Sequence, residues 1–159
     1  MFAQGEGDVR LRRDLGRPFA APAWPDGYRL RTLQAGDAST LHALLVEVLG
    51  DATDPDFEAW WAERAQDEEF EPDLCFLVFD GDGLLAAAAC SWTSAFVKEL
   101  AVRGSARRLG LGEALMLTVF AAFAARGAAH VDLKTNLAEN VDAVRLYRRL
   151  GMMEVGWEG

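Results

Sequence analysis

The sequence lacks a hydrophobic run long enough to cross a membrane. Its longest uncharged apolar stretch, residues 114–125, has twelve residues, whereas a membrane-spanning helix needs about 20. Near the amino terminus, Glu6 and Asp8 stand where a signal peptide would carry an apolar run. We therefore expect a cytoplasmic protein that neither spans nor binds a membrane.

Cysteine is scarce, with only Cys75 and Cys90 in the chain. Two cysteines make neither a disulfide framework nor a metal site of paired thiolates, so no metal is expected. A hairpin turn at residues 80–83 sets Cys75 opposite Ala88 and leaves Cys90 diagonal to it, so no bridge is expected. We interpret both thiols as small buried apolar groups in a reducing compartment.

Basic residues are also few, with 16 lysines and arginines against 25 acidic residues and a net charge of −9. Nucleic-acid binding needs a basic surface, so that class is not expected. The charges are unevenly spread, because residues 47–73 hold eleven acidic side chains and one base, Arg64, whereas basic residues dominate 98–149. These segments are suited to a cationic and an anionic ligand respectively, although both also fit ordinary solvated helix faces.

The sequence does contain enough apolar residues for one compact domain, at 159 residues and 51% apolar composition. The sequence predicts an arm over residues 1–27, with one strand at 9–15 and a Pro-Ala linker. It predicts a single domain over residues 28–159. Further strands are predicted at residues 28–33, 74–79, 84–92, 95–102, 131–135 and 152–157. Helices are predicted after Asp37, Pro55, Gly110 and Asn140. This order favours a mixed α/β sandwich.

The segment from Lys98 to Gly112 carries the clearest functional signal, as a strand and a turn followed by two glycines that enter a helix. Glycines allow a ligand to approach the backbone closely, and the unpaired amides of a helix N-terminus attract phosphate. The segment is not a dinucleotide fingerprint, because Leu115 stands at the third glycine position, and no Gly-Lys-Ser/Thr follows for a P-loop. A Gly-x-Gly pair alone fits a tight turn equally well.

Two motifs resemble those of the GNAT acetyltransferase superfamily. The stretch that resembles its motif A is Val102-x4-Arg107-x-x-Gly110-x-Gly112. The stretch that resembles its motif B, with Met in place of the commoner Phe at the end, is Asn140-x-x-Ala143-x-x-Leu146-Tyr147-x-x-x-Gly151-Met152. The resemblance covers residues 28–157, and residues 97–152 are similar to actinobacterial-type members, including the mycothiol synthase branch.

The resemblance implies an α/β GNAT fold: a mostly antiparallel twisted sheet with helices on both faces and a splayed pair of strands at the CoA site. It implies an acetyl-CoA-dependent N-acetyltransferase that acts on a primary amine of a small molecule or peptide. The acidic residues 47–73 would flank the acceptor entrance, so a cationic amine is expected. The implied CoA-binding residues are Leu100, Ala101, Val102, Arg107, Arg108, Leu109, Gly110, Leu111, Gly112, Asn140 and Ala143.

The resemblance also implies roles within this set. The loop amides of residues 107–112 would hold the CoA pyrophosphate. A strand bulge near residues 100–102 would present an amide that polarises the thioester carbonyl. Asn140 would either contact the CoA arm or cap the helix that follows it, because one side chain serves only one of these well.

Two residues are candidates for proton transfer. Tyr147 would be the general acid that protonates the departing CoA thiolate, although a helical tyrosine is more often just a half-buried aromatic. An alkylammonium acceptor must lose a proton before it attacks, and Glu99 is the candidate base because it lies on the strand that faces the thioester. Water can serve instead, and strand alternation can turn Glu99 away.

Two other functions compete with catalysis. One is a non-catalytic acyl-CoA-binding regulatory module, motivated by the absence of an obvious base. The other is a protein-interaction domain that uses the acidic helix, and only the run of carboxylates supports it.

The sequence departs from the family at its end, since GNAT domains usually continue past residues 152–157 into a strand that inserts between the fifth and sixth. The arm at residues 9–15 alternates apolar and charged residues as a half-buried strand does. We expect it to replace the missing strand by pairing near residues 152–157. The pairing would form in the same chain or be swapped into a homodimer.

Overall fold

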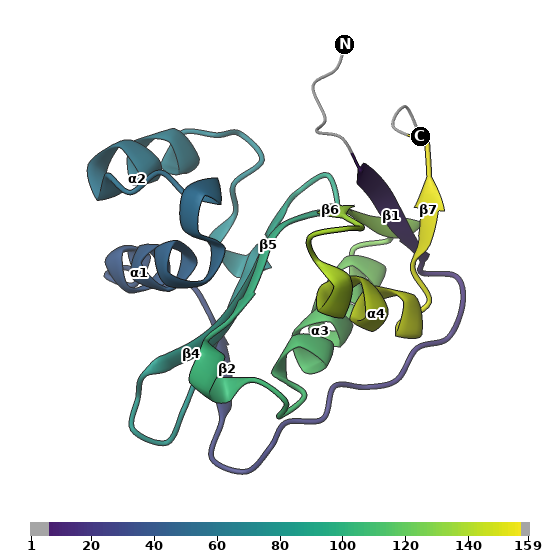
Figure 1. The fold of residues 1–159 in the computed structure, drawn as a ribbon, viewed down its shortest axis with the longest axis horizontal. Helices are drawn as coiled ribbons and strands as arrows, with labels where there is room; N and C mark the ends of the chain where they lie inside the picture. Colours follow the sequence, from purple (N-terminus) through teal and green to yellow (C-terminus); the bar gives the residue numbers. More distant parts are fainter. Residues whose placement is uncertain (1–6, 157–159) are drawn as a thin grey trace.

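The computed structural model describes residues 7–156. Residues 1–6 and 157–159 lie outside this range, and with them Trp157 of the predicted last strand. The strands are β1 (Asp8–Asp14), β2 (Arg29–Thr32), β3 (Cys75–Phe79), β4 (Leu85–Trp92), β5 (Phe96–Val102), β6 (His130–Asn136) and β7 (Met153–Val155) (Figure 1). The helices are α1 (Ala38–Leu49), α2 (Phe57–Ala65), α3 (Leu111–Ala125) and α4 (Val141–Arg149), with short 3₁₀ turns at Gly50–Ala52, Pro72–Leu74 and Gly104–Ala106.

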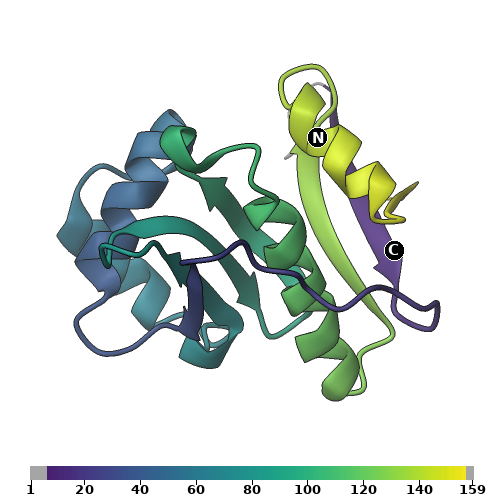
Figure 2. The same ribbon diagram turned by 90° about the horizontal axis from the view of Figure 1, so that it is seen from below.

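The seven strands form one sheet in the order β2-β3-β4-β5-β6-β1-β7. Every neighbouring pair is antiparallel except β5 and β6, which are parallel. A parallel connection needs a crossover, and α3 provides it. Helices α1 and α2 cover one face of the β2–β5 half, and α3 covers the other (Figure 2). This architecture confirms the predicted α/β fold.

The expected pairing of the arm is confirmed, and it forms within the same chain. Strand β1 lies between β6 and β7, with Leu11 opposite both Leu133 and Glu154. Val9, Leu11 and Arg13 are buried, as the alternation predicts. Asp132 of β6 is also buried, and it accepts hydrogen bonds from Arg10 and Arg12 at 2.7 to 2.8 Å.

The linker after β1 crosses the outside of α3 to reach β2 (Figure 2). Phe19 packs edge-on against Phe120 of α3 with ring centroids 5.7 Å apart. The buried Arg13 donates hydrogen bonds to the Leu150 and Pro18 carbonyls at 2.7 and 2.8 Å. Arg13 therefore ties the linker to the end of α4.

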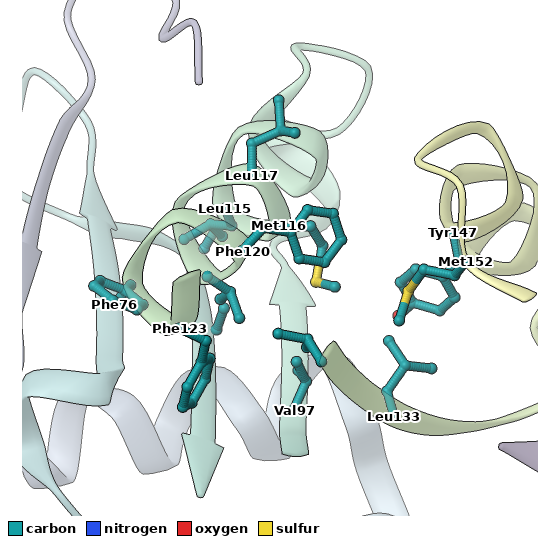
Figure 3. Close-up of a cluster of buried hydrophobic side chains, with 14 of the residues drawn as sticks. Phe76, Val97, Leu115, Met116, Leu117, Phe120, Phe123, Leu133, Tyr147 and Met152 are labelled. Carbon is teal, nitrogen blue, oxygen red and sulfur yellow. The ribbon is translucent and has the colours of Figure 1, made fainter. Parts of the chain in front are cut away.

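The apolar core has two layers, one on each face of the sheet. The larger layer holds α3, β1 and the inner side of α4, and Figure 3 shows its centre around Met116, Phe120 and Leu133. The smaller layer packs α1 and α2 onto β3, β4 and β5.

Within residues 7–156, no helix combines the length and apolar character that crossing a membrane requires.

The predicted register of the β3–β4 hairpin is wrong. Cys75 lies directly opposite Cys90, and not opposite Ala88, because the pairing at the turn already places Phe79 opposite Leu85, one residue later than predicted, and an irregularity between Val78 and Phe79 shifts it by one more. Both thiols are free and fully buried, as expected. Counting residues outward from a turn fails when one strand carries an extra residue.

Candidate functional site

The parallel strands β5 and β6 diverge in the middle of the sheet. They pair only at Phe96 with Asp132 and at Val97 with Leu133. Beyond these residues β5 stays bonded to β4, and β6 stays bonded to β1. The sheet therefore contains the predicted splayed pair of strands, with one edge of each strand open toward the other.

The backbone of β5 presents two residues to this opening. The Arg103 N–H donates to the Ala86 carbonyl at 2.8 Å, so Arg103 faces β4. Backbone groups alternate sides along a strand, so Ala101 also faces β4, while Leu100 and Val102 face the side on which β6 has diverged. The N–H groups of Leu100 and Val102 are thus directed into the splay.

The strand bulge lies earlier than the resemblance implied. Cys90 pairs with Glu99 and Ser91 pairs with Val97, which leaves Lys98 as the extra residue of β5. The bulge is therefore at residues 97–99 and not at residues 100–102. It comes directly before Leu100 and so helps to set the direction of that residue's amide.

The loop after β5 leads to the N-terminus of α3 through unusual backbone conformations. Arg108 and Gly110 both have positive φ angles, of 67° and 84°. No side chain caps α3, so its first amides stay available to a ligand. Arg107 and Arg108 are exposed, and the Nε of Arg107 donates to the Val102 carbonyl at 3.4 Å. A cationic loop, open amides and the strand opening thus adjoin one another.

Gly112 permits close packing between elements. A Cβ atom there would lie 3.3 Å from Leu146 of α4 and 3.8 Å from Val102 of β5. The second glycine of the motif therefore lets α3 approach α4 and β5, and a side chain on it would separate these elements. Nothing lies within 4 Å of a Cβ built on Gly110, where the positive φ favours glycine.

Asn140 begins α4 without capping it. Its side chain makes no capping hydrogen bond, and its Nδ2 donates instead to Thr135 Oγ1 at 3.2 Å. The capping alternative from the sequence is therefore wrong. Ala143, one turn further along α4, is half-buried and packs against the larger core.

Tyr147 projects from α4 toward Leu133 of β6, with Met152 beside it (Figure 3). Its side chain is buried, and burial raises the pKa of the hydroxyl to about 12. The phenol is therefore protonated at neutral pH and available as a proton donor. Leu133 is also where β6 leaves β5, so the Tyr147 side chain points from α4 toward the strand that borders the splay.

Glu99 is turned to the opposite face, under α2. It is 11% exposed, and Arg64 Nη2 donates a hydrogen bond to its Oε2. Burial works to lower the pKa of Arg64, but the Glu99 carboxylate outweighs it and the pKa is raised. The ion pair engages this carboxylate with Arg64 on the face of the sheet away from Tyr147. No pattern in the sequence indicates this contact between residues 35 positions apart.

A histidine and a tryptophan lie buried in and beside the smaller core. His42 is buried on α1, where its Nε2 lies 2.8 Å from the Asp54 carbonyl. Trp60 is buried in the smaller core and packs against His42.

A hollow of about 360 Å³ is lined by none of the predicted site residues. Its lining residues are Leu137, Val141, Val144, Arg145 and Arg148.

These features define an α/β protein with a split sheet, a cationic loop and a helix N-terminus at the mouth of the split. A family model described as the acetyltransferase (GNAT) family matches residues 40–152. The chain belongs to this family.

Individual proteins similar to this chain are named as acetyltransferases. The chain is 34% identical to a mycothiol acetyltransferase of Thermobispora bispora over 159 aligned positions, which cover 89% of this chain and 52% of the relative. A crystal structure of a GCN5-related N-acetyltransferase from Sphaerobacter thermophilus superposes with a TM-score of 0.82 at 27% identity, over 93% of this chain and 48% of the other. The ribosomal-protein-S18-alanine N-acetyltransferase of Escherichia coli superposes with a TM-score of 0.67 at 25% identity, over 81% and 79%. The chain spans about half the length of the curated relatives it matches.

Proposed function

We propose that this chain transfers an acetyl group from acetyl-CoA to a primary amine, with the acetyl thioester bound in the splay between β5 and β6. The observation that carries the proposal is the pair of Leu100 and Val102 amides directed into that opening. Both the family and the names of the relatives support acetyl transfer.

Each part of the site has a chemical role in this proposal. The loop amides of residues 107–112 and the Arg107 and Arg108 cations hold the pyrophosphate, because open amides and positive charge favour phosphate. The Leu100 N–H donates a hydrogen bond to the carbonyl oxygen as negative charge develops there. Asn140 and Ala143 line the CoA arm from α4. Acetyl-CoA supplies the activated acyl group, and the amine attacks it directly.

Tyr147 is the proposed general acid. A thiol has an ordinary pKa of about 8.5, so the departing thiolate gains from a donor placed nearby. The phenol holds its proton across the neutral range because its pKa is about 12. Water is the proposed proton acceptor for the amine, since Glu99 is engaged by Arg64.

The buried Glu99 also supports a second candidate function, a non-catalytic module that binds acyl-CoA. Such a module needs the loop and the splay but no base. Binding and turnover must therefore be measured separately.

Binding is tested with a matched pair of exposed leucines. Leu109, in the loop, is 44% exposed, and Leu84, at the β3–β4 turn, is 56% exposed. We expect Leu109→Glu to weaken acetyl-CoA binding at least about tenfold by placing a carboxylate among the phosphates. Leu84→Glu adds the same charge on the hairpin and should leave the affinity unchanged. Calorimetric titration that gives equal affinities for the two variants would reject the loop as the pyrophosphate site.

The acceptor is proposed to be a cationic primary amine on a small molecule or peptide. The name of the curated relatives makes a mycothiol-related amine one compound to include in a substrate panel. The cytoplasmic location stays a prediction, as does the oligomeric state.

A further inference from the structure

A buried ion pair joins α2 to β5. Arg64, in the last turn of α2, is 6% exposed. Its guanidinium carbon lies 4.8 Å from the centroid of the Trp60 ring and 5.6 Å from that of Trp92. The charge is therefore enclosed by two aromatic rings and by Glu99, on the face of the sheet opposite Tyr147.

This pair is a poor device for stability alone. Arg64 Nε and Glu99 Oε1 are both buried and have no hydrogen-bond partner among residues 7–156. Burying charges is costly, and apolar residues of similar volume usually serve stability as well or better. The pair instead holds the Glu99 side chain in one fixed position, because packing as well as charge holds both residues.

Glu99 lies where the backbone of β5 is least supported by its neighbouring strands. Strand β5 loses its pairing with β6 after Val97, and the extra residue Lys98 interrupts its pairing with β4. Glu99 is the first residue after this irregularity, and Leu100 follows it. The contact with Arg64 is a side-chain tether on β5 at the point where its backbone pairing is weakest.

We propose that Arg64 is a positioning residue for acetyl transfer: through Glu99 it fixes the bulge of β5 and with it the direction of the Leu100 N–H. This inference rests on the proposed function, in which that N–H stabilises the developing oxyanion. It assigns Glu99 to holding the strand and not to removing the proton of the amine. A donor of this kind is effective only when its direction is set before the reaction.

The test is a double-mutant cycle with Arg64→Met, Glu99→Met and the double variant. The double variant removes both charges together and so avoids leaving one buried charge alone. We expect kcat to fall about 10- to 100-fold in each of the three, with the double variant no worse than either single one, because the two residues act as a unit. The affinity for acetyl-CoA should change less than about twofold.

Two further variants separate positioning from proton transfer. Glu99→Gln keeps an oxygen that accepts from Arg64, so it should retain most of the activity and the pH–rate profile of the wild type. If Glu99 were the general base, Glu99→Gln would instead abolish the ascending limb of the pH–rate profile. The matched control is Glu71→Met with Arg126→Met, an ion pair whose members are 36% and 40% exposed. It should leave kcat unchanged.

A readout without turnover keeps this inference separate from the proposed function. In ¹⁵N-labelled protein, the Leu100 amide resonance should shift or broaden in Arg64→Met, which leaves the sequence neighbours of Leu100 unchanged, and stay in place in the Glu71→Met/Arg126→Met control. If the wild type transfers no acetyl group, the proposed function fails, and this resonance still reports on the tether. An unchanged Leu100 resonance, or a Glu99→Gln variant as inactive as Glu99→Met, would overturn the inference.

Discussion

At the scale of single residues, Tyr147 decides whether the site supports acid catalysis. Its place in a motif suggested the role, but the sequence could not show its environment. The structure places it in a buried position on α4, with Leu133 of the diverging strand and Met152 around it. That burial is the physical cause of its raised pKa.

Tyr147→Phe removes the hydroxyl and keeps the packing of the ring. We expect kcat to fall about 10²-fold, because the thiolate then leaves without a proton donor, while acetyl-CoA affinity is nearly unchanged. Steady-state kinetics together with calorimetric titration checks this. Equal losses in affinity and rate would show that the hydroxyl is structural.

The same hydroxyl links stability to alkaline pH. The folded pKa of about 12 lies above the ordinary value of 10.0, so the stabilisation is complete below pH 10 and is lost as the pH rises through 12. At pH 11 the wild type should have lost roughly 1 kcal/mol that Tyr147→Phe does not lose. Urea unfolding of both proteins at pH 9 and pH 11 measures the difference. Parallel changes in the two proteins would contradict the assigned burial.

At the scale of elements, periodicity and punctuation located the strands and the starts of the helices within one or two residues. Gly127 and Gly151 end α3 and α4 with positive φ angles, as the sequence indicated. What could not be predicted was register, because the irregularities near Val78 and Lys98 leave no mark in an apolar/polar pattern. Both errors, the Cys75 partner and the bulge position, have this one cause.

Strand β1 depends on one buried carboxylate. Burial works to raise the pKa of Asp132, but hydrogen bonds from Arg12 and Arg10 outweigh it and the pKa is lowered from 3.8. Its stabilising effect is therefore present above that value and lost as the pH falls through the folded pKa. We expect Asp132→Asn to lower the free energy of unfolding by about 1–3 kcal/mol at pH 7.

The deficit of Asp132→Asn should shrink as the pH falls below 4, since Asp132 of the wild type then gains a proton in the unfolded state, and at still lower pH in the folded state as well. Guanidinium chloride unfolding at pH 7 and pH 3 measures it. Asp142→Asn is the matched control, because that side chain is fully exposed and lies 3.8 Å from Arg145. An equal loss of unfolding free energy at both pH values would show that the effect of Asp132→Asn does not depend on the charge of Asp132.

At the scale of the whole molecule, the arm was placed by its own sequence pattern. The alternation of apolar and charged residues at 9–15 predicted a half-buried strand, and β1 pairs with β6 and β7. The Arg64–Glu99 contact had no such signal. Its residues are 35 positions apart, and nothing in the pattern around Arg64 distinguishes it from a surface base.

Arg64 also changes how the charge distribution is interpreted. It is the one base within residues 47–73, and its burial leaves it unable to offset the acidic surface of that segment. Glu47 and Glu71 are paired with Arg103 and Arg126. Most of the eleven carboxylates are nevertheless exposed, and they set the potential around α2.

Cationic amines should therefore be better substrates than neutral or anionic amines of similar size. Their advantage in kcat/KM should shrink as salt rises from low ionic strength to about 0.5 M, because screening shortens the reach of exposed charges. A series of diamines, monoamines and amino acids assayed at three salt concentrations tests this. A preference for anionic amines, or no effect of salt, would contradict it.

The proposed activity is acetyl transfer from acetyl-CoA to an amine at the β5–β6 splay. Its most direct test is the release of free CoA thiol across a panel of primary amines, with mass spectrometry of each acceptor. We expect thiol release above the amine-free background, matched by one acetyl group gained on a cationic amine. At acetyl-CoA concentrations below the KM, the rate should fall about tenfold or more in Leu109→Glu and stay unchanged in Leu84→Glu. Tight acetyl-CoA binding without thiol release for any amine would contradict the claim and leave the chain as an acyl-CoA-binding module.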